Sequence, residues 1–208
     1  MSPRPAVFVD RDGIINELRP DPVTGELEAP LAVSDVALIE KAPRATASLE
    51  AAGFILVGVT NQPSAAKGKI TLEQQDAIHA RVIQLLADAG VRLSKWMICP
   101  HHPEGIVSEL SLDCECRKPR PGMLLSAARD LDIDLAASWM IGDSDSDIEA
   151  GLAVGTRTIL VGKESSPKRR HPERASFVAD DIESASTHIL HANAHSGRDC
   201  RSGGRPGK

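Results

Sequence analysis

The chain has 208 residues, enough for one domain with a sizeable core. Its formal net charge of −5 argues against nucleic acid as the main partner. The sequence shows neither an apolar run of membrane-spanning length nor a signal-peptide pattern, so we expect a cytoplasmic protein that does not bind membranes. Aromatic residues are few, with three Phe, two Trp and no Tyr, so aliphatic side chains must fill the core.

The first stretch of interest, residues 6–13, joins a short apolar run to Asp10-Arg11-Asp12 and Gly13. The apolar run predicts a buried strand over residues 6–9. Because strand side chains alternate, we expect Asp10 and Asp12 to point one way and Arg11 the other. In a central parallel strand, both carboxylates would lie at the edge where open α/β sheets bind ligands. Taken alone, an inert acidic turn explains this stretch equally well.

Residues 14–35 form a long irregular stretch that contains several prolines and a turn signal near Gly25. A structureless segment of this length inside a compact domain is usually functional. We therefore expect a flap over a binding site, with an inert surface loop as the alternative.

The following segments alternate between strand and helix signals. We expect helices at 42–52, 71–89, 122–131, 146–153 and 182–190, and strands at 54–59, 96–98, 139–141, 158–161 and 177–179. Thr71 and Gln74 suit a capping box, and His79 on the same helix is expected to be an ordinary surface residue. The alternation predicts an α/β fold, a Rossmann-like, doubly wound parallel sheet with helices on both faces.

Two polar, basic segments are expected to be disordered. They are residues 163–174, with Lys168-Arg169-Arg170, and the tail from about Ala192. We expect one domain over residues 1–190, followed by the basic tail over 191–208, and a monomer.

Polar groups follow the predicted strands and can converge at one edge of a parallel sheet. They are Asp10 and Asp12, Thr60 and Asn61, Arg117 and Lys118, and Asp143. Carboxylates beside cations and a hydroxyl suit Mg²⁺ and a phosphate, because Mg²⁺ prefers oxygen ligands and cations pair with phosphate oxygens.

The loop after the third of these strands carries four possible soft-metal ligands. Cys99 and His101 begin it, and Cys114 and Cys116 end it. Four such ligands are the number that a closed structural zinc site needs. The alternative is three buried cysteines and a chance histidine. A bound zinc ion would hold the loop and so position Arg117 and Lys118, which directly follow Cys116.

The polar segments resemble, in order, the four motifs of the haloacid dehalogenase superfamily of phosphatases. The matching segments are 10–13, 60–62, 117–119 and 142–147, within a resemblance that covers roughly residues 5–162. The resemblance implies a capless fold of this superfamily with a zinc loop, and Mg²⁺-dependent hydrolysis of a phosphomonoester through an aspartyl phosphate.

The resemblance also implies residue roles. Asp10 would be the nucleophile, and Asp12 the general acid and then the general base. Thr60 and Asn61 would bind the phosphoryl oxygens, and Lys118 would neutralise charge near Asp10.

The same resemblance implies a magnesium site at the fourth motif. Mg²⁺ would bind Asp143, the Asp10 carboxylate and the backbone carbonyl of Asp12. Asp147 would be the second, supporting acidic residue of that motif, and Asp145 is expected to be merely exposed.

Within the superfamily, the zinc loop resembles that of the phosphatases of heptose 1,7-bisphosphate, with histidinol-phosphate phosphatases as close relatives. Arg117 would then face the substrate. The chain departs from the expected pattern at Lys67, where an Arg is expected, and at Ser144, where a Lys often stands.

Other functions remain open at this point. The same chemistry could act on histidinol phosphate or on a DNA 3′-phosphate end, although the negative net charge argues against DNA. A phospho-acceptor signalling domain would not need an acid two residues after its aspartate, which distinguishes it by Asp12. A zinc-stabilised binding module with an inert acidic edge would release no phosphate from any substrate.

Overall fold

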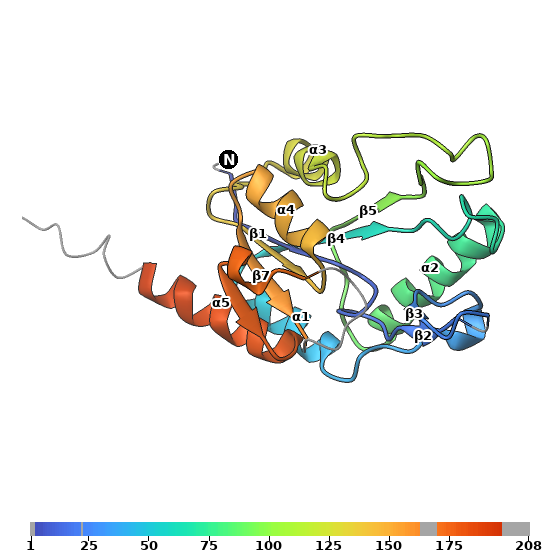
Figure 1. Ribbon diagram of the computed structural model, residues 1–208. Helices are drawn as coiled ribbons and strands as arrows, with labels where there is room; N and C mark the ends of the chain where they lie inside the picture. The colour runs from blue at the N-terminus through green and yellow to red at the C-terminus, as the bar shows by residue number, and fades with distance from the viewer. Residues whose placement is uncertain (1–2, 22, 163–169, 197–208) are drawn as a thin grey trace, which may run out of the picture.

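The computed structural model describes residues 3–21, 23–162 and 170–196. A six-stranded parallel sheet runs through its centre in the order β5-β4-β1-β6-β7-β8 (Figure 1). The strands are β1 (Ala6–Val9), β4 (Ile55–Asn61), β5 (Lys95–Cys99), β6 (Trp139–Gly142), β7 (Arg157–Val161) and β8 (Phe177–Ala179). With β1 between β4 and β6, three strands deliver their carboxyl ends side by side.

Helices cover both faces of the sheet, as predicted. They are α1 (Ala42–Ala51), α2 (Leu72–Asp88), α3 (Gly122–Leu131), α4 (Asp145–Ala153) and α5 (Ile182–Ser196). Helices α3 and α4 pack on one face, and α1, α2 and α5 pack on the other (Figure 1). Phe8 packs toward α3 and α4, whereas Val7 and Val9 pack toward the opposite group. Because side chains alternate along a strand, a central strand covered on both faces is apolar at every position.

Helix α2 begins at the predicted capping box. The Thr71 hydroxyl accepts a hydrogen bond from the backbone N–H of Gln74 at 3.2 Å, and the Gln74 side chain accepts one from the N–H of Thr71 at 2.8 Å. The prediction for His79 was wrong: this side chain is half-buried, with its ring centroid 4.9 Å from that of Trp96. The Trp96 ring comes from β5, a contact that the periodicity of the helix does not reveal.

The stretch 14–35 contains a small hairpin rather than irregular chain throughout. Strands β2 (Arg19–Pro20) and β3 (Leu27–Glu28) pair antiparallel, and a short 3₁₀ helix, η1, follows at Val33–Asp35. Asp21 shapes the turn, because its carboxylate accepts hydrogen bonds from the N–H groups of Val23 (2.7 Å) and Thr24 (2.8 Å).

The C-terminal part is more ordered than the sequence indicates. Arg170 donates to the carbonyl of Gly162 at 2.7 Å, and a 3₁₀ helix, η2, spans Pro172–Arg174, so the expectation of disorder was wrong for residues 170–174. Helix α5 extends to Ser196, past the predicted end at residue 190. Residues 163–169 and 197–208 lie outside the described residues. Within the described residues, every helix is too short or too polar to cross a bilayer.

Candidate active site

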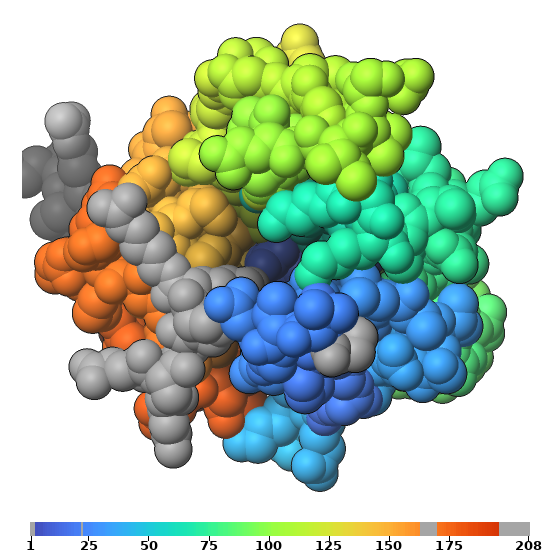
Figure 2. Space-filling view, turned by 45° about the vertical axis from the view of Figure 1, so that its right-hand side comes forward, coloured from blue at the N-terminus to red at the C-terminus, as the bar shows by residue number. Residues whose placement is uncertain are grey.

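A cavity of about 520 Å³ lies at the carboxyl ends of β1, β4 and β6. Figure 2 shows it as a hollow with the dark blue of the segment that follows β1 at its base. The β2–β3 hairpin, the loop after β4, the loop after β5 and the start of α4 surround the opening. This volume suits a small-molecule ligand.

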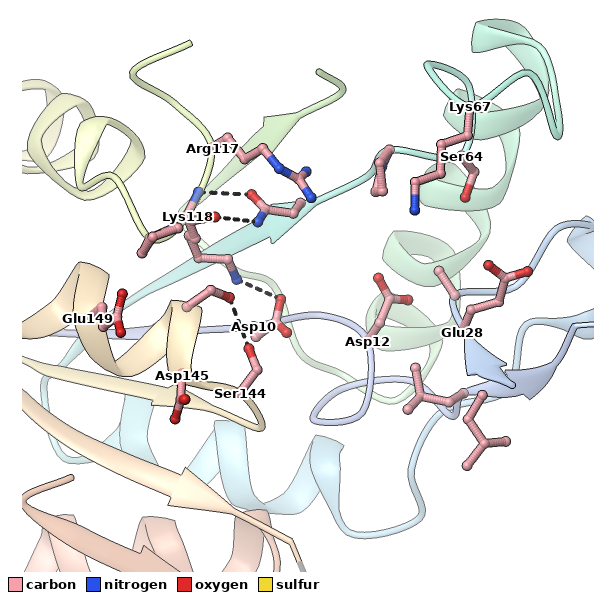
Figure 3. Close-up of a pocket in the computed structure, with 17 residues that line it drawn as sticks. Asp10, Asp12, Glu28, Ser64, Lys67, Arg117, Lys118, Ser144, Asp145 and Glu149 are labelled. Atoms are coloured by element: carbon pink, nitrogen blue, oxygen red, sulfur yellow. Dashed lines mark hydrogen bonds and ion pairs between the residues drawn. The ribbon is translucent and has the colours of Figure 1, made fainter. Parts of the chain in front are cut away.

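Lys118 lies at the centre of the site and is 3% exposed. Its ammonium group is 2.9 Å from Asp10 Oδ1 (Figure 3), lies 2.6 Å from Asp147 Oδ1 and donates to the Val59 carbonyl at 2.7 Å. Burial alone would lower the pKa of Lys118, but the charges of Asp10 and Asp147 outweigh burial and raise it. Lys118 therefore remains a fixed positive charge beside Asp10.

Three carboxylates gather around this position. Asp10, Asp143 and Asp147 each place an oxygen within 4.8 Å of the others, and all three residues are buried. Gly13 makes room for them: its φ is +90°, and a Cβ there would lie 2.4 Å from Asp143 Oδ2. A set of hard oxygen donors of this kind suits a divalent cation such as Mg²⁺.

Asp147 uses its carboxylate to hold its neighbours. Oδ2 accepts hydrogen bonds from the N–H (3.1 Å) and the hydroxyl (2.7 Å) of Ser144, the N-cap residue of α4, while Oδ1 faces Lys118. Gly142 allows this close packing, since a Cβ there would lie 2.2 Å from the Asp147 Cβ. The structure thus places Asp147 as a support of Lys118 and of the fourth-motif loop.

The Asp12 carboxylate is held by a network of donors. Oδ1 accepts from Asn16 Nδ2 at 2.9 Å and from Arg11 Nη2 at 3.0 Å, and Oδ2 accepts from Gln62 Nε2. Burial alone would raise the pKa of Asp12, but the Arg11 charge and these hydrogen bonds lower it overall. Asp10 and Asp12 both line the cavity and Arg11 does not, as strand alternation predicts, although the long Arg11 side chain still reaches Asp12.

Thr60 and Asn61 occupy the end of β4. The Thr60 hydroxyl accepts from Gln62 Nε2 at 2.7 Å, and Thr60 is buried beneath the cavity lining rather than in it. Asn61 lines the cavity and binds the backbone of Lys118 through its side-chain amide. Gln62, which the sequence motif includes without a role, is thus the residue that links Thr60 to Asp12.

The structure brings the four predicted zinc ligands together. The Sγ of Cys116 lies 3.2 Å from the Sγ atoms of Cys99 and Cys114, and His101 Nδ1 is 3.4 Å from Cys116 Sγ. These cysteines form no disulfide. Burial and the neighbouring thiols raise the pKa of Cys116. A cation bound between the thiols would instead favour the thiolate and lower that pKa. The three-sulfur, one-nitrogen donor set fits a structural zinc ion.

The loop between Cys99 and Cys116 leads directly to the cavity wall. Arg117 follows Cys116, and its guanidinium donates to the His101 carbonyl at 3.1 Å. In Figure 3, Arg117 and Lys67 extend toward the space above Asp10 and Asp12. The departure from the expected pattern at Lys67 thus keeps a positive charge in the lining.

The expectation that Asp145 is merely exposed was wrong. Asp145 is 6% exposed, and its carboxylate accepts the backbone N–H of His171 at 2.6 Å and lies 2.5 Å from His171 Nδ1. Burial would raise the pKa of Asp145, but the contacts with His171 outweigh it and lower the pKa. This contact fastens residues 170–174 to the start of α4.

A parallel sheet with converging carboxylates and a buried lysine at one edge is the arrangement of an α/β protein of phosphoryl transfer. Comparison with known proteins agrees. Residues 115–185 match the family described as HAD-hydrolase-like. The D-glycero-beta-D-manno-heptose-1,7-bisphosphate 7-phosphatase of Yersinia pestis is 40% identical over 82% of this chain and 87% of the relative.

Two further relatives extend this comparison. The phosphatase of the same name from Escherichia coli K12 is 41% identical over 79% of this chain and 83% of its own. The crystal structure of D,D-heptose 1,7-bisphosphate phosphatase from B. bronchiseptica, complexed with magnesium and phosphate, has a TM-score of 0.69 at 26% identity and covers 90% of this chain and 99% of that one. The chain belongs to the haloacid dehalogenase superfamily, in the family of these phosphatases.

Proposed function

We propose that the protein removes the 7-phosphate of D-glycero-D-manno-heptose 1,7-bisphosphate. The observation that carries this proposal is Asp10 at the base of the cavity, bound to Lys118, with Asp12 two residues later in the same lining. Relatives of this name align over most of the chain, which supports the choice of substrate.

In the proposed first step, an Asp10 oxygen attacks phosphorus and the bond from phosphorus to the sugar oxygen breaks. Asp12 gives a proton to the departing alkoxide, and Asp10 becomes an aspartyl phosphate. Lys118 holds Asp10 in place and offsets negative charge on the phosphoryl group.

In the second step, water attacks phosphorus while Asp12 takes a proton from the water. The bond to Asp10 breaks, and inorganic phosphate leaves. The hydrogen bonds from Arg11, Asn16 and Gln62 favour the carboxylate form of Asp12, which this step requires. The proton that Asp12 takes from water restores the acid that the next first step needs.

Two metals fit the residues present. Asp10, Asp143 and the backbone carbonyl of Asp12 would hold Mg²⁺, which stabilises charge on the phosphoryl oxygens when bound. Cys99, His101, Cys114 and Cys116 would hold zinc in a structural role, and the loop that they fasten carries Arg117 and Lys118.

The remaining roles concern substrate contacts. Arg117 lines the cavity and would bind the substrate outside the reacting phosphate. Asn61 would contact the phosphoryl group from the end of β4, and the buried Thr60 would contribute its hydroxyl once the group is bound. Cytoplasmic location and the monomeric state stay predictions.

The decisive experiment compares phosphate release from heptose 1,7-bisphosphate, as both anomers, with release from histidinol phosphate at matched concentrations in Mg²⁺. We expect a kcat/KM that favours the bisphosphate, and no release by Asp10→Asn. A preference for histidinol phosphate would show that the proposed substrate is wrong, but it would leave the proposed phosphatase mechanism unchanged. Failure with every phosphomonoester would reject the enzyme.

A further inference from the structure

The β2–β3 hairpin and the loop after β4 form two facing walls of the cavity. The hairpin side contributes Leu27 and Glu28 to the lining, and the loop contributes Ser64 and Lys67. Figure 2 shows the blue hairpin and the blue-green loop meeting beside the opening. The distance between these walls determines how much of a ligand beyond its reacting phosphate they enclose.

A single ammonium group bridges the two walls. Lys69 Nζ lies 2.8 and 2.7 Å from the two carboxylate oxygens of Glu28 in β3, and it also pairs with Asp21 Oδ2 at the turn. The other oxygen of Asp21 shapes the turn itself through Val23 and Thr24. One lysine thus contacts both ends of the hairpin connection.

The loop that carries Lys69 is itself firmly held. The Lys69 N–H donates to the Ser64 carbonyl at 3.0 Å, and the Ala66 carbonyl accepts from the N–H groups of Ile106 (2.8 Å) and Val107 (3.1 Å) in the zinc loop. The hairpin strands are only two residues long each, too short to be stable alone. The lysine therefore ties a weak element to a strong one.

Surface ion pairs usually contribute little to stability, but this one differs in its burial. The Asp21 side chain is only 5% exposed. Without Lys69, two carboxylates would face each other, one of them in a site with little access to water, and their repulsion would move the hairpin away from the loop.

We propose that Lys69 is a positioning residue that sets substrate specificity by holding Glu28 and the hairpin in the cavity wall. The inference rests on the proposed function and extends it to the part of the sugar phosphate beyond the reacting group. In place, Glu28 can accept hydrogen bonds from hydroxyl groups of a polyol, with Lys69 balancing its charge.

The test uses Lys69→Met, Lys69→Arg and Lys41→Met in the full chain. Lys41 is the matched control, since it bridges Asp181 (2.7 Å) and Glu183 (3.1 Å) on the surface between α1 and α5. For Lys69→Met we expect KM for heptose 1,7-bisphosphate to rise on the order of tenfold with kcat nearly unchanged. Turnover of a small aryl phosphate should stay close to wild type, Lys69→Arg should restore most of the loss, and Lys41→Met should resemble wild type.

Hydrogen exchange of the hairpin amides provides the second readout. The amides of Arg19, Asp21 and residues 23–28 should exchange faster in Lys69→Met and not in Lys41→Met. A raised KM with unchanged exchange would make Lys69 a direct substrate contact and overturn the positioning role. An equal loss of activity on both substrates, or no change in KM and exchange, would also overturn that role. If the wild-type protein itself fails to hydrolyse the bisphosphate, the proposed function fails. The exchange result still shows whether Lys69 holds the hairpin.

Discussion

The side chain of Asn61 pairs with the backbone of Lys118 as a neighbouring strand would. Asn61 Nδ2 donates to the Lys118 carbonyl at 2.9 Å, and the Lys118 N–H donates to Asn61 Oδ1 at 3.1 Å. The two residues lie 57 positions apart, one at the end of β4 and one just after Cys116. Asn61 therefore fixes the point from which the Lys118 side chain reaches Asp10.

Asn61→Ala should lower kcat by about 10- to 100-fold, because a displacement near 1 Å at a catalytic group costs about 10² in rate. The two backbone groups of Lys118 would also lose their partner, so the melting temperature should fall. Steady-state kinetics and calorimetry measure both effects. Gln84→Ala is the control, since its amide binds only Asp88 on the exposed side of α2. A near wild-type kcat would contradict the positioning role of Asn61.

The two carboxylates after β1 should fail in different ways. Asp10→Asn should abolish turnover and phosphoenzyme together, because no nucleophile remains. Asp12→Asn should still be phosphorylated by an aryl phosphate, whose good leaving group needs little acid, and then stall before hydrolysis. Loss of acid–base help costs about 10²–10⁴ in rate. Rapid-quench trapping should reveal a burst of phosphoenzyme, and steady turnover by Asp12→Asn near the wild-type rate would sink the assignment.

The Cys/His cluster predicts about one zinc ion per chain, measurable by metal analysis of the purified protein. Cys114→Ala should lose the metal and much of its thermal stability, since binding of structural zinc is coupled to folding. Cys200→Ser, which changes the cysteine that is not among the predicted zinc ligands, is the control and should retain zinc. Active, folded wild-type protein without zinc would refute the site.

His79 should make stability depend on pH. Burial against Trp96, helped by the charge of Arg11, lowers the pKa of His79 to about 4. An unfolded histidine has a pKa of about 6.5, so between those values the unfolded chain binds a proton that the folded chain does not. The free energy of unfolding should therefore fall as pH drops from about 6.5 to 4, by at most about 1.4 kcal/mol per pH unit from this group.

Denaturant titrations of wild type and His79→Phe across this pH window would measure that contribution. The variant should show a shallower loss of stability, whereas His191→Phe, which changes an exposed histidine of α5, should keep the wild-type slope. An identical slope in His79→Phe would show that His79 does not cause the dependence.

Strong apolar runs made the central elements predictable from sequence. All six strands of the sheet were found, since buried parallel strands are continuously apolar. The predicted end of β4 was too early. Thr60 and Asn61 are polar and so do not continue the apolar run, yet they pair with Ile98 and Cys99 of β5. The hairpin was missed because its strands are two residues long and its anchor, Lys69, lies more than 40 residues away.

Side-chain partners were harder to predict than elements. The convergence of Asp10, Lys118 and Asp143 followed from parallel topology, and the cysteine spacing indicated the cluster. The burial of Asp145 depends on His171, 26 residues later in a segment with a disordered composition. Such pairings arise from tertiary contacts, which local pattern and propensity do not encode.

The central place of β1 also constrains how the chain can be synthesised. One edge of β1 pairs with β4, and the other edge pairs with β6, which is synthesised much later. The Ala6 N–H donates to the Ser138 hydroxyl, which lies 132 positions away in the sequence. A growing chain therefore carries an entirely apolar strand with one open edge until residue 142 has left the ribosome. Open edges of this kind invite association between chains. The interval between the synthesis of β4 and that of β6 is thus a period in which this edge of β1 is open to such association.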